Sequence, residues 1–234
     1  MSTRAAYLVL GCKPWNARVF REKIAGLPGT WRYADSPEAL EEAALEALNP
    51  RFLFFLHWSR KVPPRVTDRY ECVCFHMADV PYGRGGSPLQ NLILRGHRDT
   101  KLTALRMIRE MDAGPVYAKR DLSLEGSAEE ILIRASHLSA AMIADLAARE
   151  PVPVEQAGEP VVFSRRKPAE SAIGAPADIS GLHDFIRMLD ADGYPPAFLD
   201  HGGFRYRFKR AALYDGRIAA DVEITPIPKE NGTE

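Results

Sequence analysis

The sequence predicts an α/β protein: a mainly parallel sheet flanked by helices, followed by a small β-rich unit at the C-terminal end. Three observations support this prediction. Short apolar runs typical of buried strands alternate with helical patterns through residues 1–149. Segments rich in Pro, Glu, Gly and Ala then indicate connecting loops. Finally, one helix and a period-two pattern mark a separate block, so we expect a main domain over 1–176 and a C-terminal domain over 177–234.

The predicted strands and helices follow from local patterns. Apolar or period-two runs of strand length lie at 6–11, 52–56, 72–75, 102–107, 116–124 and 204–208. Apolar stripes and capping signals typical of helices lie at 15–25, 36–48, 87–96, 127–149 and 182–190. Ser36 before Pro37 is a good N-cap, and Ser127 with Glu130 is typical of a capping box.

Composition limits the classes of function. The 31 basic and 31 acidic residues give zero formal net charge, so the sequence gives no support for a nucleic-acid partner. The three cysteines (Cys12, Cys72 and Cys74) lack a zinc-type pairing with histidines, and their odd number argues against a disulfide framework. We expect reduced thiols, a cytoplasmic location and no metal. Because no apolar run approaches about 18 residues and no signal-peptide pattern is seen, we expect no membrane association.

The stretch from His76 to Asp112 is the most informative part of the sequence. His76 follows a predicted strand and precedes a loop rich in proline and glycine, a place where ligands sit in open α/β sheets. A histidine there suits acid–base chemistry, although position alone favours a structural loop histidine. Gly83–Gly86 is neither a phosphate-binding Walker loop nor a dinucleotide fingerprint. Asp112 alone is typical of a turn aspartate.

Taken together, the landmarks of this stretch resemble the catalytic core of the formyltetrahydrofolate-dependent formyltransferases. That family includes methionyl-tRNA formyltransferase, a purine-pathway transferase and the nucleotide-sugar N-formyltransferases. The matching positions are His76, Pro81, Arg84, Gly85, Pro88, Gln90, Gly96, Thr100, Thr103, Asp112 and Gly114. They fall into register without a gap, and weaker similarity extends over residues 52–208.

The resemblance implies a Rossmann-like fold, 10-formyltetrahydrofolate as cosubstrate and no metal. It implies that His76 and Asp112 form the catalytic centre, with Asp112 accepting the proton of the amine and His76 stabilising an oxyanion or relaying a proton. The residues that it implies for folate binding are His57, Trp58, Ser59, Arg84, Gly85, Gly86, Met111 and Gly114. The residues expected to bind the acceptor substrate are Tyr82, Gln90 and Asn91.

One position departs from the family pattern. Two residues before the histidine, where the family has an asparagine that donates to the formyl oxygen, this chain has Cys74. A thiol is a weak donor, and losing one oxyanion donor typically slows a reaction by about a hundred- to a thousandfold. We therefore include Cys74 in the catalytic set. Either His76 or another group has to supply the donor, and Asn91 is near in sequence.

The acceptor amine stays open between branches of the family. The short C-terminal part and the zero net charge favour the nucleotide-sugar branch, whose acceptors are nucleotide-linked amino-deoxy sugars made for surface polysaccharides such as lipopolysaccharide. Tyr82, Tyr117 and Tyr194, with Arg84, are candidates to line such a pocket. One alternative is an enzyme like methionyl-tRNA formyltransferase acting on another amine. Another is a folate-binding protein or formyltetrahydrofolate hydrolase with weak transferase activity. A homodimer through the strand at 204–208 is a further open point.

Overall fold

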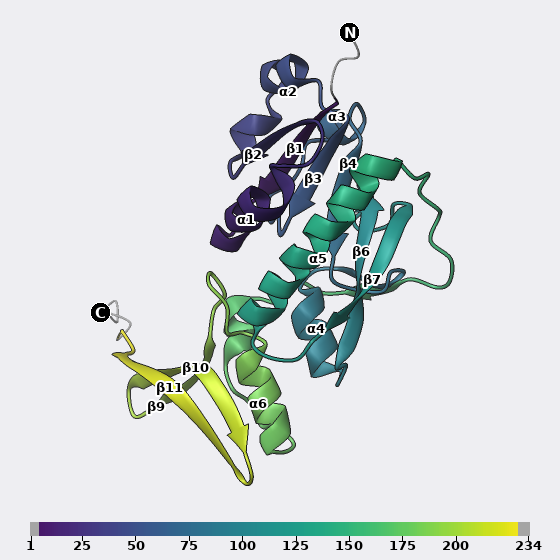
Figure 1. The fold of residues 1–234 in the computed structure, drawn as a ribbon. Coiled ribbons are helices and arrows are strands. Elements are labelled where there is room, and N and C mark those ends of the chain that lie inside the picture. Colours follow the sequence, from purple (N-terminus) through teal and green to yellow (C-terminus); the bar gives the residue numbers. More distant parts are fainter. Residues whose placement is uncertain (1–4, 229–234) are drawn as a thin grey trace, which may run out of the picture.

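A six-stranded sheet forms the centre of the molecule in a computed structural model, which describes residues 5–228 (Figure 1). The strand order is β2-β1-β3-β4-β6-β7. Its members are β1 (Ala6–Gly11), β2 (Thr30–Ala34), β3 (Phe52–Leu56), β4 (Cys72–His76), β6 (Asp99–Arg106) and β7 (Val116–Ser123). The first four strands are parallel, whereas β6 and β7 pair antiparallel. The predicted α/β fold with a mainly parallel sheet is therefore confirmed.

Helices cover both faces of this sheet, because its central strands are apolar on both sides. On one face lie α1 (Pro14–Val19), its π-helical continuation η1 (Phe20–Ile24) and α5 (Ala128–Arg149), which pack with Val9, Phe54 and Val73. The other face is covered by η2 (Pro37–Leu40), α2 (Glu42–Leu48) and α3 (Pro64–Thr67), and it buries Leu8 and Phe55. Successive residues of one strand therefore enter two different cores.

The long helix α5 begins with the predicted capping box. Ser127 accepts from the backbone N–H of Glu130, while the Glu130 carboxylate accepts from the Ser127 N–H. By length and composition alone α5 could cross a membrane, but half of its apolar window is buried within the protein. Figure 1 shows α5 running across the face of the sheet, as expected of a core helix.

Some local predictions are wrong. The single helix expected at 36–48 is two short helices, η2 and α2, because Glu41 is extended between them, and within the described residues the Ser36 side chain makes no cap hydrogen bond. Strand β2 was not predicted. Two further short strands, β5 (Tyr82–Gly85) and β8 (Val161–Phe163), lie in segments that were predicted to be loops, and they pair with each other. The 3-10 turn η3 (Pro168–Ser171) also lies in a predicted loop.

The C-terminal part is a helix and a three-stranded antiparallel sheet, β9 (Ala197–His201), β10 (Phe204–Tyr214) and β11 (Arg217–Pro226). Its helix α6 (Ile179–Arg187) starts three residues before the predicted position, because Asp178 caps it. Figure 1 shows this sheet on the far side of α6 from the main body. The strand predicted at 204–208 is confirmed: it is the first part of β10, and Phe204 and Phe208 pair with residues of both neighbouring strands.

Candidate active site

The candidate site begins at the carboxyl end of β4. Cys74 and His76 are two residues apart on this strand, so their side chains lie on the same face of the sheet. That face is the one opposite α5, because Cys72 and Cys74 pack with the second core. His76 is the last residue of β4 and pairs with Thr103 on β6. The sheet thus holds the His76 imidazole at its carboxyl edge, where open α/β sheets generally bind ligands.

Two neighbours fix the orientation of the His76 ring, which is 9% exposed. Its Nε2 lies 2.7 Å from the Gly83 carbonyl oxygen. A carbonyl can only accept, so Nε2 carries a hydrogen. On the other side, Nδ1 lies 3.5 Å from Oδ2 of Asp112. Nδ1 is therefore the ring nitrogen that can gain or lose a proton, and it faces a carboxylate.

Asp112 reaches His76 from the loop between β6 and β7. Its backbone is left-handed, with φ 54°, which is uncommon for a residue other than glycine and is a form of strain found at functional sites. The Gly85 N–H donates to its Oδ2 at 3.0 Å. Two residues further along the chain, only glycine fits at Gly114, because a Cβ there would lie 2.0 Å from the Arg106 carbonyl oxygen. The loop is thus folded tightly against the sheet.

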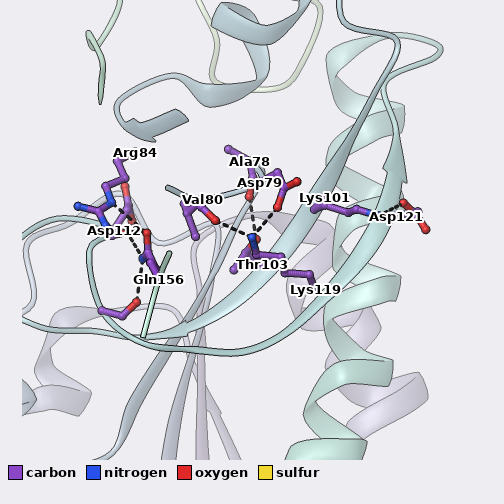
Figure 2. A network of polar contacts seen from close by, with 11 residues as sticks. Ala78, Asp79, Val80, Arg84, Lys101, Thr103, Asp112, Lys119, Asp121 and Gln156 are labelled. Carbon is purple, nitrogen blue, oxygen red and sulfur yellow. Dashed lines mark hydrogen bonds and ion pairs between the residues drawn. The ribbon is translucent and has the colours of Figure 1, made fainter. Parts of the chain in front are cut away.

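A residue that the sequence did not suggest, Gln156, holds this loop in place (Figure 2). Its Nε2 donates to the carbonyls of Asp112 and Gly114, both at 2.8 Å. Its Oε1 accepts from Nε and Nη2 of Arg84 at 3.0 and 2.8 Å. Arg84 therefore acts on the Asp112 loop through Gln156, and its Nη1 lies 3.5 Å from Glu110.

The segment after His76 is held from the antiparallel strands β6 and β7, as Figure 2 also shows. The Thr103 hydroxyl donates to the Ala78 carbonyl at 2.7 Å. Lys119 donates to both the Asp79 carboxylate and the Val80 carbonyl. Thr103, one of the positions that match the family motif, thus has a structural role: its hydrogen bond to Ala78 fixes the turn that brings Gly83 back to His76.

Cys74 lies beside this pair. Burial raises the pKa of its thiol far above the usual value, and the negative charge of Asp112 raises that pKa further. The thiol is therefore protonated at neutral pH and is a weak donor. The alternative donor Asn91 is already engaged, since its amide donates to the carbonyls of Gly86, Ser87 and Ser164.

The predicted folate loop, His57-Trp58-Ser59, follows β3 at the same edge of the sheet. His57 has φ 48°, and its ring turns toward Asn16 and Ser136 rather than toward His76. Trp58 packs edge-on against Phe55. The strands that follow β1 in the chain lie on opposite sides of it: β2 on one side and β3 on the other. The loop after β3 therefore lies at a topological switch point, where open α/β sheets generally bind ligands.

The predicted acceptor-binding residues make contacts within the protein. The Gln90 amide donates to the Met188 carbonyl in the C-terminal part, and the Tyr82 hydroxyl bonds to His97. Tyr117 is at the opposite end of the sheet from His76, because it binds Glu71 just before β4. By contrast, Met111 beside Asp112 is 69% exposed and presents an apolar surface. The structure thus does not gather Tyr82, Tyr117 and Gln90 around the His76–Asp112 pair.

The structure is thus an α/β protein with a His76–Asp112 pair at the carboxyl edge of its sheet. A family model described as the C-terminal domain of methionyl-tRNA formyltransferase matches residues 168–225. A solved structure described as methionyl-tRNA formyltransferase from Clostridium thermocellum is 40% identical, with a TM-score of 0.90, over 95% of this chain and 99% of that chain. The chain therefore belongs to the formyltransferase family.

More distant relatives share the fold. HypX from Aquifex aeolicus in complex with tetrahydrofolic acid is 19% identical, with a TM-score of 0.70, over 89% of this chain and 38% of that chain. A likely sugar N-formyltransferase from Mycobacterium tuberculosis is 18% identical, with a TM-score of 0.63, over 97% and 99%. Among curated relatives, methionyl-tRNA formyltransferase of Ehrlichia canis is 23% identical over 78% of this chain, and this chain spans only 61% of its length.

Proposed function

We propose that the protein transfers the formyl group of 10-formyltetrahydrofolate to an amine, as an N-formyltransferase. The observation that carries this proposal is the placement of Nδ1 of His76 3.5 Å from the carboxylate of Asp112, at the ligand-binding edge of a sheet with this family's fold. Two groups that share one proton suit acyl transfer, in which the attacking amine loses a proton and the leaving folate nitrogen gains one.

The hydrogen-bond pattern supports a distinct role for each member of the pair. Because Nε2 of His76 is occupied by the Gly83 carbonyl, proton exchange takes place between Nδ1 and Asp112. The amine adds to the formyl carbon, and its proton passes to this pair, directly or through water. The resulting imidazolium charge stabilises the oxyanion of the tetrahedral intermediate. The same proton is then delivered to the leaving nitrogen of the folate.

The folate fits the residues that frame the site. The Gly85 N–H holds the Asp112 carboxylate at the site, and the exposed side chain of Met111 offers apolar contact beside Asp112. That HypX is described in complex with tetrahydrofolic acid supports the choice of cosubstrate. We retain His57, Trp58, Ser59, Arg84, Gly85, Gly86, Met111 and Gly114 as the proposed folate-binding set. No metal takes part in this reaction scheme.

For the acceptor amine, the comparisons favour an enzyme like methionyl-tRNA formyltransferase over the nucleotide-sugar enzyme that the sequence suggested. The 40% identical structure and the curated relatives carry the tRNA description, whereas the sugar N-formyltransferases are 18% identical or less. We retain an amino sugar on a nucleoside diphosphate as the second candidate, because two sugar N-formyltransferases share the fold over nearly the whole of both chains, with TM-scores of 0.63 and 0.62.

Exposed cations at the site edge agree with either acceptor, since both carry phosphates. Arg60, Lys61 and Arg65 follow β3, are exposed and form no ion pair among residues 5–228. Local positive charge of this kind attracts phosphates although the whole chain is neutral. We further propose that 1–176 is the catalytic domain, that 177–234 is a small C-terminal domain and that the protein works in the cytoplasm, where its three free thiols would stay reduced.

Formyl transfer by two variants tests the proposed chemistry. Asp112→Asn keeps the size of the side chain but cannot accept a proton, and His76→Ala removes the ring that shares it. We expect each to lower turnover by about a hundredfold or more, with the thermal unfolding temperature little changed. The assay follows tetrahydrofolate release in the presence of an acceptor amine. Near wild-type turnover by either variant would show that the pair is not the catalytic centre.

A comparison of acceptors decides between the remaining possibilities. Wild-type protein is incubated with 10-formyltetrahydrofolate and, in parallel, with methionyl-tRNA, with nucleotide-linked amino sugars, or with no amine. Formylation of the tRNA supports the first candidate, and formylation of a sugar supports the second. Formate released at the same rate without any amine identifies a hydrolase. Folate binding with neither transfer nor hydrolysis identifies a binding protein.

A further inference from the structure

A buried polar network fixes the protonation of His57, the residue that follows β3. The Asn16 Oδ1 accepts from the Lys13 N–H at 3.0 Å, so the Asn16 Nδ2 group faces the other way. Its two hydrogens are donated to Nδ1 of His57 and to the hydroxyl oxygen of Ser136, both at 3.1 Å. The Ser136 hydroxyl donates its own hydrogen to the Leu132 carbonyl. Nδ1 of His57 is therefore an acceptor.

The consequence is a free donor on the other ring nitrogen. With Nδ1 accepting, the neutral ring carries its hydrogen on Nε2. Among residues 5–228, Nε2 has no hydrogen-bond partner, and this nitrogen is open to solvent. Burial and the charge of Lys13 lower the pKa of His57 to about 4, so the ring is neutral at pH 7.

The position of this donor points to a ligand. His57 stands at the switch point between β1 and β3, where open α/β sheets bind ligands. The loop after β1 frames the same place, since the Cys12 thiol donates to the His57 carbonyl at 2.8 Å and the Trp15 ring meets the His57 ring edge-on. Gly11 leaves room for the network, because a Cβ there would lie 2.7 Å from the Cβ of Asn16.

We propose that Nε2–H of His57 donates a hydrogen bond to an acceptor atom of the bound folate, and that Asn16 acts as a positioning residue by fixing the ring tautomer. The acceptor is a carbonyl oxygen or an unprotonated ring nitrogen, because only these groups can receive this hydrogen. This inference rests on the proposed function for the identity of the ligand. It assigns to the His57 side chain a role in addition to the backbone contacts that the sequence suggested for its loop.

Nitrogen-15 NMR of the imidazole rings tests the tautomer without any change to the site. The His57 signals are assigned as those missing from the His57→Gln spectrum. At pH 7 we expect the Nε2–H tautomer, and we expect the Nε2 signal to shift when 5-formyltetrahydrofolate, the probe, is added to saturation. A Nδ1–H tautomer, or a Nε2 signal that saturating probe leaves unchanged, would overturn the proposal.

Calorimetric titration with the same probe measures the contribution to binding. His57→Phe removes the donor, and we expect its Kd to rise about tenfold. His57→Gln has an oxygen that can face Asn16 and an N–H that can face the ligand, so its Kd should stay within about threefold of the wild-type value. His201→Phe, on the exposed end of β9, is the matched control and should bind like wild type.

The outcomes separate the two proposals. If wild-type protein neither binds the probe nor transfers formyl to any amine, the proposed function fails and this inference fails with it. If wild-type protein binds the probe and His57→Phe binds it equally well, only the role of His57 is overturned. If His57→Phe does not fold, as judged by thermal unfolding, the NMR result on the wild-type protein decides.

Discussion

At the scale of single residues, the departure of this site from its family lies in Cys74. The usual asparagine is absent, the Asn91 amide is held by three backbone carbonyls, and the Gln156 amide is held by the Asp112 loop. Two groups beside Asp112 are left to offset the oxyanion charge: the weak thiol donor of Cys74, and the positive charge that His76 gains when the pair takes up the proton of the amine. We therefore assign most of the oxyanion stabilisation to His76.

This assignment predicts a small effect of Cys74→Ala. Because a thiol donates weakly, we expect formyl transfer to fall by less than about tenfold, compared with the hundred- to thousandfold typical of an amide donor. Cys72→Ala, two residues earlier on the same face of β4, is the matched control for cavity formation and should change stability without changing kcat. A hundredfold loss in Cys74→Ala alone would identify the thiol as the main oxyanion donor.

His57 gives the protein a specific sensitivity to acid. Its pKa is about 4 in the folded protein and about 6.5 in an unfolded chain. Above pH 6.5 neither state binds the proton, so His57 adds nothing to the pH dependence. As the pH falls from 6.5 to 4, only the unfolded state takes up the proton, and stability falls. Lys13 acts on His57 through its charge, and the Cys12 thiol donates to the His57 carbonyl.

Urea unfolding at several pH values measures this effect. We expect the wild-type protein to lose stability relative to His57→Gln between pH 6.5 and 4, by an amount on the order of 3 kcal/mol or less. The exposed carboxylates titrate alike in both proteins, so the difference between the two curves isolates His57. Parallel curves over this range would contradict a neutral His57 in the folded protein.

At the scale of elements, the sequence predicted best what local pattern determines. The apolar run Phe52–Leu56 and the capping box at Ser127 each specify a structure within a few residues, and both predictions are confirmed. Strand β2 was missed because it lies at the edge of the sheet and only part of its side chains are covered. Strands β5 and β8 are short, and each depends on a partner far away in the chain.

In the candidate site, too, the sequence predicted the residues at motif positions but not those whose role depends on long-range contacts. His76, Asp112 and Cys74 stand at motif positions, and the fold brings them together. The role of Gln156 could not be read from the sequence, because it depends on contacts with Arg84, 72 residues away, and with Asp112, 44 residues away. Gln156 lies in a segment whose composition indicates only a loop.

The pairing of β5 with β8 predicts the effect of one substitution. A Cβ at Gly86 would stand 2.4 to 2.8 Å from three atoms of Arg165, including its backbone, so the segment after β8 would have to move. We expect Gly86→Ala to lower the free energy of unfolding by about 1–3 kcal/mol and to slow formyl transfer, since neighbouring Gly85 holds Asp112.

Gly26→Ala is the matched control for this experiment. At Gly26 an added Cβ meets no atom within 4 Å, and its backbone is not left-handed. That variant should be neutral or slightly more stable, because alanine restricts the unfolded chain. Equal stabilities of the two variants in urea would show that the contact between Gly86 and Arg165 is looser than the structure indicates.

At the scale of the whole molecule, Arg187 joins the C-terminal part to the main body. It ends α6 and is 4% exposed. Its Nη1 donates to the carbonyls of Leu124 and Gly126, just before α5, at 2.6 and 2.8 Å. Its Nε donates to Asp184 at 2.6 Å. Removing Arg187 would leave these two carbonyls without their donor and Asp184 paired only with the exposed Arg98, which is destabilising.

We expect Arg187→Met to lower the free energy of unfolding by about 3 kcal/mol and to make residues 177–228 more sensitive to proteolysis. Arg98→Ala is the matched control, because Arg98 pairs with the same Asp184 but its side chain is 58% exposed, so its loss should cost less than about 1 kcal/mol. Urea unfolding and limited proteolysis measure both effects. If the two variants are equally stable, the buried arginine does not join the two parts of the chain, and their association depends on apolar packing such as that of Ile186 and Leu189 with the main core.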